Sequence, residues 1–141
     1  MKKTLIFILL FNLIFSLCVF GEEYVTVTVN GTEIKSDVSA VLVNGRTMLP
    51  LRAVLNSLSV PDENIKWWDL SESVEVTHKG IHIFMAIGVN ECFYNGIKYN
   101  LDVPAFVRNG RTLVPVRFFG EALGFSVNWI DSERKVEIRS K

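Results

Sequence analysis

Residues 109–117 read Asn-Gly-Arg-Thr-Leu-Val-Pro-Val-Arg, and residues 44–52 read Asn-Gly-Arg-Thr-Met-Leu-Pro-Leu-Arg. In both stretches Asn-Gly predicts a tight hairpin turn, because a type I′ turn needs positive φ at its two central residues. A short apolar strand follows, and then a proline, which suits the start of a helix because an N–H there has no partner within the helix. This pair decides the fold: it predicts two hairpin-and-helix units, and neither stretch holds an obvious catalytic residue.

The similarity continues on both sides of the twin stretches. Upstream, Asn30-Gly31 recurs 65 residues later, which is also the spacing of the twins. Downstream, Trp67 corresponds to Trp129 at an offset of 62, because the first copy has three more residues in a loop. A period of this length indicates a duplicated unit and not a solenoid repeat. We therefore predict two tandem copies of a hairpin-hairpin-helix-hairpin unit, over about residues 24–87 and 90–141.

Periodicity predicts the elements within each copy. Residues 24–29 alternate as a half-buried strand does, and apolar residues at helical spacing predict a helix that begins after Pro50. A second helix is expected from Pro115 or Val116 to Leu123, with Gly120 inside it in close packing and Gly124 as its C-terminal cap. The strand expected at residues 81–87 has no counterpart in the second copy, and we expect it to bridge the halves.

The first 21 residues have the layout of a secretory signal peptide. Lys2 and Lys3 precede an almost wholly apolar run, and the small Gly21 stands before Glu22. The alternative is a retained membrane anchor, for which the run is short. We expect cleavage after Gly21, which leaves one domain over residues 22–141 that is secreted or held in the cell envelope, with no membrane contact.

Charge and cysteine content limit what the exported chain can do. The full chain has 15 basic and 15 acidic residues, so losing Lys2 and Lys3 leaves a net charge of −2. No basic face for nucleic acid is therefore expected. Cys92 is then the only cysteine, and no intrachain disulfide can form. It corresponds to Val27, which predicts a small buried hydrophobe in preference to a reactive thiol or a link between chains.

A family resemblance rests on several motifs of the second copy. Besides residues 109–117, these are Glu121-Ala122-Leu123-Gly124, Val127-Asn128-Trp129 and Lys135-Val136-Glu137-Ile138. Together they resemble the copper amine oxidase N-terminal domain-like family, the stalk domains of secreted bacterial proteins. The resemblance covers about Tyr24 to Lys141, although Asn56-Ser57-Leu58-Ser59 replaces Glu-Ala-Leu-Gly in the first copy. It implies an α+β fold in which an antiparallel sheet wraps around short helices.

The resemblance does not imply amine oxidation, and we expect no enzyme, no cofactor and no metal. The copper site of the oxidases uses three histidines and a tyrosine that becomes a quinone, whereas this chain has two histidines, His78 and His82. They flank the Lys79-Gly80 turn and could face each other across a hairpin, but a metal usually needs further ligands. Exposed turn-flanking residues are the alternative. No paired carboxylates or Ser-His-Asp set stands out either.

Four arginines recur as two pairs and are candidate ligand contacts: Arg46 and Arg52 in the first copy, Arg111 and Arg117 in the second. Guanidinium groups bind carboxylate or phosphate through two parallel hydrogen bonds. The structural alternative is that they bond loop carbonyls or pair with Asp69, Asp131 or Glu121, and recurrence favours it, since a duplicated fold must repeat its framework.

The three tryptophans are candidates for stacking on sugar rings. Trp67 and Trp129 are equivalent, which predicts that both are core residues. Trp68 lies on the other strand face and is the better candidate for an exposed aromatic, although a second buried face is equally consistent with the pattern.

Two functions are consistent with these features. The first is a non-catalytic exported structural or protein-interaction module of the cell envelope. The alternative is a cell-wall or glycan-binding module that uses exposed aromatics and the arginines. The partner is accordingly an envelope protein or a cell-wall polymer. An exposed row of aromatic side chains would favour the glycan, and fully buried tryptophans the protein.

Overall fold

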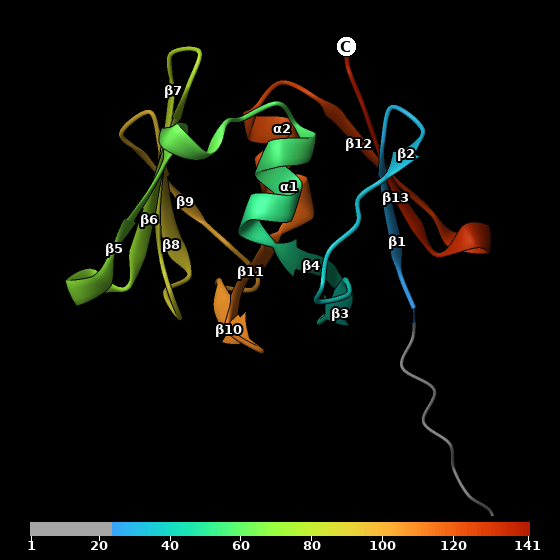
Figure 1. Cartoon of the computed structure of the whole chain (residues 1–141), viewed down its shortest axis with the longest axis horizontal. Helices are drawn as coiled ribbons and strands as arrows, with labels where there is room; N and C mark the ends of the chain where they lie inside the picture. Colours follow the sequence, from blue (N-terminus) through green and yellow to red (C-terminus); the bar gives the residue numbers. More distant parts are fainter. Residues whose placement is uncertain (1–23) are drawn as a thin grey trace, which may run out of the picture.

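The computed structural model describes residues 24–141 (Figure 1). The predicted signal peptide and its cleavage site before Glu22 lie outside the described residues. Within these residues three β-sheets surround two short α-helices, α1 (Leu51–Ser57) and α2 (Val116–Ala122), which lie in the middle of the molecule. The α+β class is therefore confirmed.

Each sheet combines strands from both halves of the chain. Sheet A contains β12 (Ser126–Ile130), β13 (Lys135–Arg139), β1 (Thr26–Val29) and β2 (Thr32–Glu33) in that order. Sheet B contains β10 (Phe106–Arg108), β11 (Arg111–Pro115), β4 (Arg46–Pro50) and β3 (Val41–Val43). Sheet C contains β5 (Ile65–Trp68), β6 (Ser73–His78), β7 (Ile81–Ala86), β8 (Glu91–Tyr94) and β9 (Ile97–Asn100). Sheets A and C stand on either side of the helices, and sheet B lies beneath them (Figure 1).

Two details differ from the predicted single antiparallel sheet. The strands form three separate sheets, and β1 pairs with β13 in parallel. A parallel pair requires a long connection, and here almost the whole described chain lies between the two strands. Strand β7 pairs with β6 of the first half and β8 of the second, which confirms that it bridges the halves.

The central sheet has a symmetric register. Leu49 of β4 faces Val114 of β11, and these two residues are 65 positions apart. The pairs on either side are Pro50 with Leu113 and Met48 with Pro115. Replacing each residue by its counterpart 65 positions away turns one of these pairs into the other. An approximate two-fold axis therefore passes through the Leu49–Val114 pair and relates the strand-to-helix segments of the two halves.

The core is shared by the two halves. A single buried cluster includes Val27, Leu55 and Met85 from the first half and Phe119 and Ile138 from the second. Burial of such side chains contributes about 1.5–3 kcal/mol each. A smaller cluster lies beneath sheet B and contains Val38, Met48, Val103 and Leu113.

The glycine predictions are confirmed where the backbone or the packing requires glycine. Asn109 and Gly110 have φ of 48° and 73°, as a type I′ turn needs. A Cβ on Gly120 would lie 2.6 Å from Val127 Cγ2, so helix α2 packs closely on β12 at this residue. Gly124 caps α2 with φ of 89°. Its counterpart in the first half is Ser59, which adopts φ of 65° despite its side chain.

Candidate functional site

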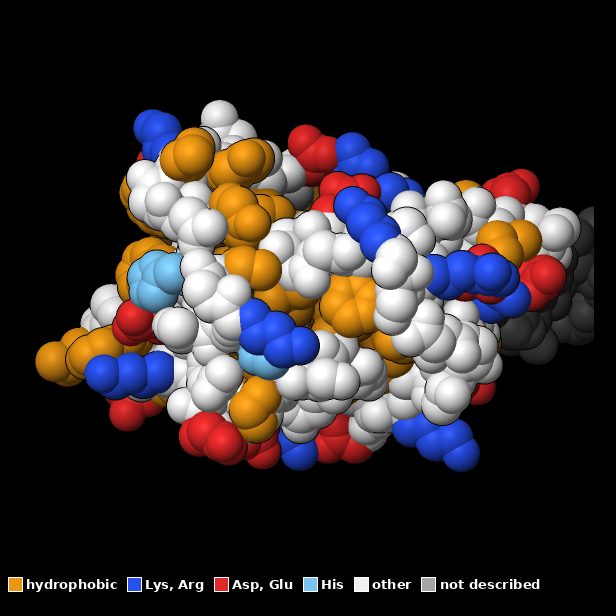
Figure 2. Space-filling model, turned by 90° about the horizontal axis from the view of Figure 1, so that it is seen from above, with side chains coloured by type: hydrophobic (Ala, Val, Ile, Leu, Met, Phe, Trp, Pro, Cys, Tyr) orange, Lys and Arg blue, Asp and Glu red, His pale blue; other side chains and the backbone are white. Residues whose placement is uncertain are grey.

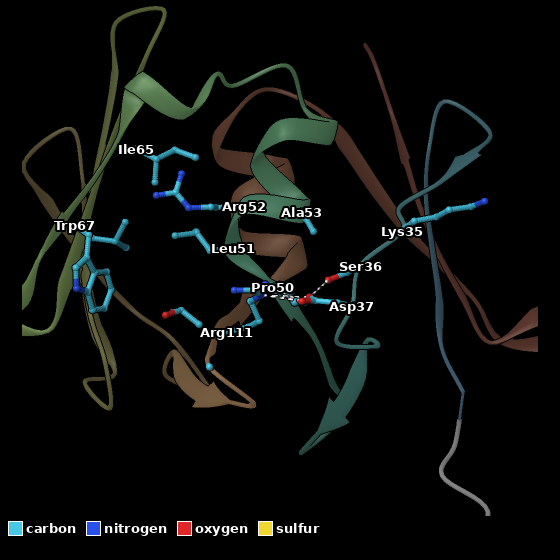
Figure 3. Close-up of a pocket in the computed structure, with 13 residues that line it drawn as sticks. Lys35, Ser36, Asp37, Pro50, Leu51, Arg52, Ala53, Ile65, Trp67 and Arg111 are labelled. Carbon is cyan, nitrogen blue, oxygen red and sulfur yellow. Dashed lines mark hydrogen bonds and ion pairs between the residues drawn. The ribbon is translucent and has the colours of Figure 1, made fainter.

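The first candidate site is a cleft between helix α1 and sheet C, with a volume of about 510 Å³. The β4–α1 junction contributes Pro50, Leu51 and Arg52, and sheet C contributes Trp67. The turn between β10 and β11 and the start of β11, from the other half of the chain, contribute residues 110–112. Figure 3 shows Leu51 and Arg52 extending from α1 toward Ile65 and Trp67. We call this the first cleft.

A second cleft has nearly the same composition with the halves exchanged. Its volume is about 470 Å³, and the β11–α2 junction contributes Pro115, Val116 and Arg117. Trp129 of sheet A takes the place of Trp67. Residues 45–47, at the β3–β4 turn and the start of β4, take the place of residues 110–112. Each cleft is therefore built from both halves, and the approximate two-fold axis relates one cleft to the other.

Two of the candidate arginines join the halves through ion pairs. Arg111 Nη2 lies 2.7 Å from Asp37 Oδ2, and Arg46 forms the corresponding pair with Asp102. The hydrogen bonds from Arg111 hold the pKa of the Asp37 carboxyl below its ordinary value of 3.8, and the same carboxylate raises the pKa of Arg111. These side chains are more than half exposed. Each pair therefore fixes the position of an arginine but contributes little stability.

The other two arginines are held at the helix starts. Arg52 Nη1 lies 2.8 Å from Asp62 Oδ1, and Arg117 Nη1 donates to Glu121 Oε1 at 3.0 Å and to the Val127 carbonyl at 2.9 Å. Of the carboxylates predicted as partners, Glu121 is the one that pairs with a candidate arginine. The Asp37, Asp62 and Asp102 partners were not predicted.

The prediction that Trp67 and Trp129 are core residues is wrong. They are 38% and 36% exposed, although each lies on the inner face of its sheet. The reason is position in the sheet: β5 and β12 are edge strands, so each tryptophan has a neighbouring strand on one side only. Trp67 lines the first cleft and Trp129 the second, where its Nε1 donates to Asp131 Oδ1 at 3.1 Å.

For Trp68 the sequence left an exposed aromatic and a second buried face equally open. The side chain is 42% exposed, on the outer face of sheet C. One face of its ring is covered by Lys66, whose Nζ lies 3.8 Å from the ring centroid. Its Nε1 donates to Glu75 Oε2 at 3.2 Å. Trp68 is therefore engaged by its neighbours and lies on the opposite side of the strand from the first cleft.

The two histidines do not face each other. Thr77 pairs with His82 and His78 with Ile81, so alternation along β6 and β7 puts the histidines on opposite faces of the hairpin. His82 Nε2 lies 2.7 Å from Glu75 Oε1, and this contact, together with that from Trp68, lowers the pKa of Glu75. No group of three or more His, Cys, Asp or Glu side chains in residues 24–141 is arranged to hold a metal ion.

Cys92 is fully buried in sheet C, as predicted for the counterpart of Val27. Burial raises the pKa of its thiol to about 11. Because the thiolate is the reactive form, the buried thiol is inert.

The end of the molecule opposite sheet B has a further hollow of about 390 Å³. Leu58, His78, Leu123 and Phe125 are among its lining residues, and hydrophobic side chains are visible on this end in Figure 2. The hollow contains none of the recurring arginines and tryptophans, so the two clefts remain the candidate sites.

Comparison with known proteins gives a family match. The family model described as the copper amine oxidase N-terminal domain matches residues 28–138. No curated protein matches the chain. Across the described residues, no helix has both the length and the hydrophobicity needed to cross a membrane.

Proposed function

We propose that this chain, which belongs to the copper amine oxidase N-terminal domain family, is a non-catalytic binding module exported to the cell envelope. In copper amine oxidases this domain is non-catalytic. The observation that carries the proposal is the pair of clefts, each with an exposed tryptophan and arginines fixed at its wall. Export is supported by the signal-like pattern of residues 1–21.

We further propose that the two halves are tandem copies of one hairpin-hairpin-helix-hairpin unit. The sequence offsets of 65 and 62 residues support this, as does the recurrence of the strand-to-helix segment at β4–α1 and β11–α2. The pairing of Leu49 with Val114 in sheet B, two residues that are 65 positions apart, adds to that support.

The partner is an envelope protein or a cell-wall glycan, and one observation favours the glycan. Trp67 and Trp129 are exposed at the mouths of clefts, where the flat face of an indole can pack against an apolar sugar face. A module with a purely structural role gains nothing from keeping such side chains partly in water.

Co-sedimentation of the mature chain, residues 22–141, with purified cell walls tests this function. Walls are prepared with and without protease treatment that removes their proteins. Binding to both preparations supports a glycan partner, and binding to the untreated walls alone supports a protein partner. If the chain stays in the supernatant with both, the proposal of an envelope-binding module is wrong.

Export has its own test. N-terminal sequencing of the protein recovered outside the cytoplasm should begin at or near Glu22. Recovery of an intact Met1 on membrane-bound protein would show a retained anchor and contradict cleavage.

A further inference from the structure

We infer that the two clefts are equivalent binding sites for a sugar that carries a carboxylate, so that one chain binds two such units. This inference rests on the glycan-binding form of the proposed function. It adds the location of the sites, their number and the chemical class of the ligand.

Basic side chains line both clefts. The first cleft is lined by Lys35, Arg52 and Arg111 against one carboxylate, Asp37. The second is lined by Arg46, Arg117 and Arg134 against Asp131. Carboxylates beside the clefts pair with three of these arginines: Asp62 with Arg52, Asp102 with Arg46 and Glu121 with Arg117. A ligand anion would therefore bind to the guanidinium donors that the ion pairs leave over.

The arginines keep hydrogen-bond donors for a ligand. Arg111 uses Nε and Nη2 for Asp37, and Arg46 uses the same two atoms for Asp102. Among the described residues, no hydrogen bond is made by Nη1 of either side chain. The ion pairs therefore hold each guanidinium in place without using all its donors, and a ligand carboxylate can accept from those that remain.

The apolar part of each cleft suits one face of a sugar ring. Trp67 stands beside Pro50, Leu51 and Val74 in the first cleft. Trp129 stands beside Pro115, Val116 and Val136 in the second. Volumes of about 510 and 470 Å³ are in the ordinary range for small-ligand sites.

The clefts recur in both halves of the chain, whereas the other aromatic surface of the molecule does not. The outer face of sheet C carries Trp68, Phe84 and Phe93. The positions that correspond to Trp68 and Phe93 in the other half are Ile130 and Thr28, so that surface has no twin. The tryptophan and the two recurring arginines are present in both clefts.

Two equivalent sites on one chain change how it binds a polymer. A second sugar unit of the same or a neighbouring polymer chain binds at a high effective concentration once the first is bound. Apparent affinity for a polymer of acidic sugars should therefore exceed that for one isolated unit.

Isothermal titration of the mature chain with tri-galacturonate tests the inference, with the neutral galactotriose as the matched ligand. We expect two equivalent sites for the acidic trisaccharide, at least tenfold weaker binding of the neutral one, and weaker binding as salt is raised. Trp67→Ala and Trp129→Ala should each leave one site, and the double variant none. These side chains are partly exposed, and circular dichroism checks that the variants fold.

Trp68→Ala is the matched control, because it removes an adjacent, equally exposed tryptophan from the opposite face of the strand. It should keep both sites. Loss of binding in Trp68→Ala, or unchanged binding in the double variant, would place the site outside the clefts and overturn the inference. If the chain binds protease-treated walls but not tri-galacturonate, or binds both trisaccharides equally, the inference fails while the glycan-binding function stands.

Discussion

At the residue scale, the C-terminal ends of α1 and α2 show that serine can replace glycine at a position of positive φ, at a cost in stability. Gly124 and Ser59 occupy corresponding positions after α2 and α1, and both have positive φ, 89° and 65°. Glycine adopts this region freely, whereas a side chain there costs about 1–2 kcal/mol. The sequence shows that serine replaces glycine at position 59. That Ser59 still adopts a positive φ is seen only in the structure.

Ser59→Gly should stabilise the chain. Relief of the left-handed strain outweighs the greater entropy of glycine in the unfolded state, and we expect a gain of about 0.5–1 kcal/mol in the free energy of unfolding. Urea denaturation measures it. The reciprocal variant Gly124→Ser should lose stability, and a loss in Ser59→Gly would contradict this account of the helix end.

Gly120→Ala should destabilise the chain even though alanine is the better helix former. The new Cβ would lie 2.6 Å from Val127 Cγ2, and overpacking of this kind costs about 1–3 kcal/mol. A double-mutant cycle with Val127→Ala checks the cause. The two substitutions together should cost less than the sum of the two alone, and simple additivity would show that the contact is not responsible.

At the scale of elements, sequence patterns predicted most strands, both helices and the Asn-Gly turns because those signals are local. They did not predict which hairpins pair, because each outer sheet joins strands from opposite halves of the chain. Trp67 and Trp129 were misassigned for the same reason: alternation gave the correct inner face, but not the fact that β5 and β12 are edge strands. The candidate arginines were found by recurrence, while three of their four acidic partners lie where no local pattern indicates a pair.

Because the Arg111–Asp37 ion pair joins the two halves, we expect it to make the stability of the folded chain depend on pH. The pKa of Asp37 is lowered in the folded chain, so its contribution to stability is present above its ordinary pKa of 3.8 and is lost as pH falls through the lowered value. NMR titration should find the Asp37 pKa below 3.8 in the wild type. In Arg111→Gln the pKa should return toward 3.8.

The stability difference between wild type and Asp37→Asn should accordingly shrink as the solution is acidified below pH 4. Glu63→Gln is the control, because Glu63 makes no ion pair among the described residues. A difference that stays constant through the acid range would mean that the ion pair does not couple protonation to folding.

At the scale of the whole molecule, the interleaved sheets make the two halves depend on each other. Strand β1 completes the sheet formed by β12 and β13, and β8 and β9 complete the sheet formed by β5, β6 and β7. A half of about 60 residues alone buries too little surface to be reliably stable. Each cleft also takes one of the four recurring arginines from each half, so the proposed binding sites exist only when both halves are folded together.

Hydrogen exchange on Phe119→Ala tests this dependence most directly. Phe119 belongs to the second half and is fully buried, so its truncation should cost about 3–5 kcal/mol. We predict that the amides of β6, in the first half, lose protection to the same extent as those of β13, in the second. If β6 keeps its wild-type protection while β13 loses it, the halves are independent units, and the account of a shared core and composite clefts is contradicted.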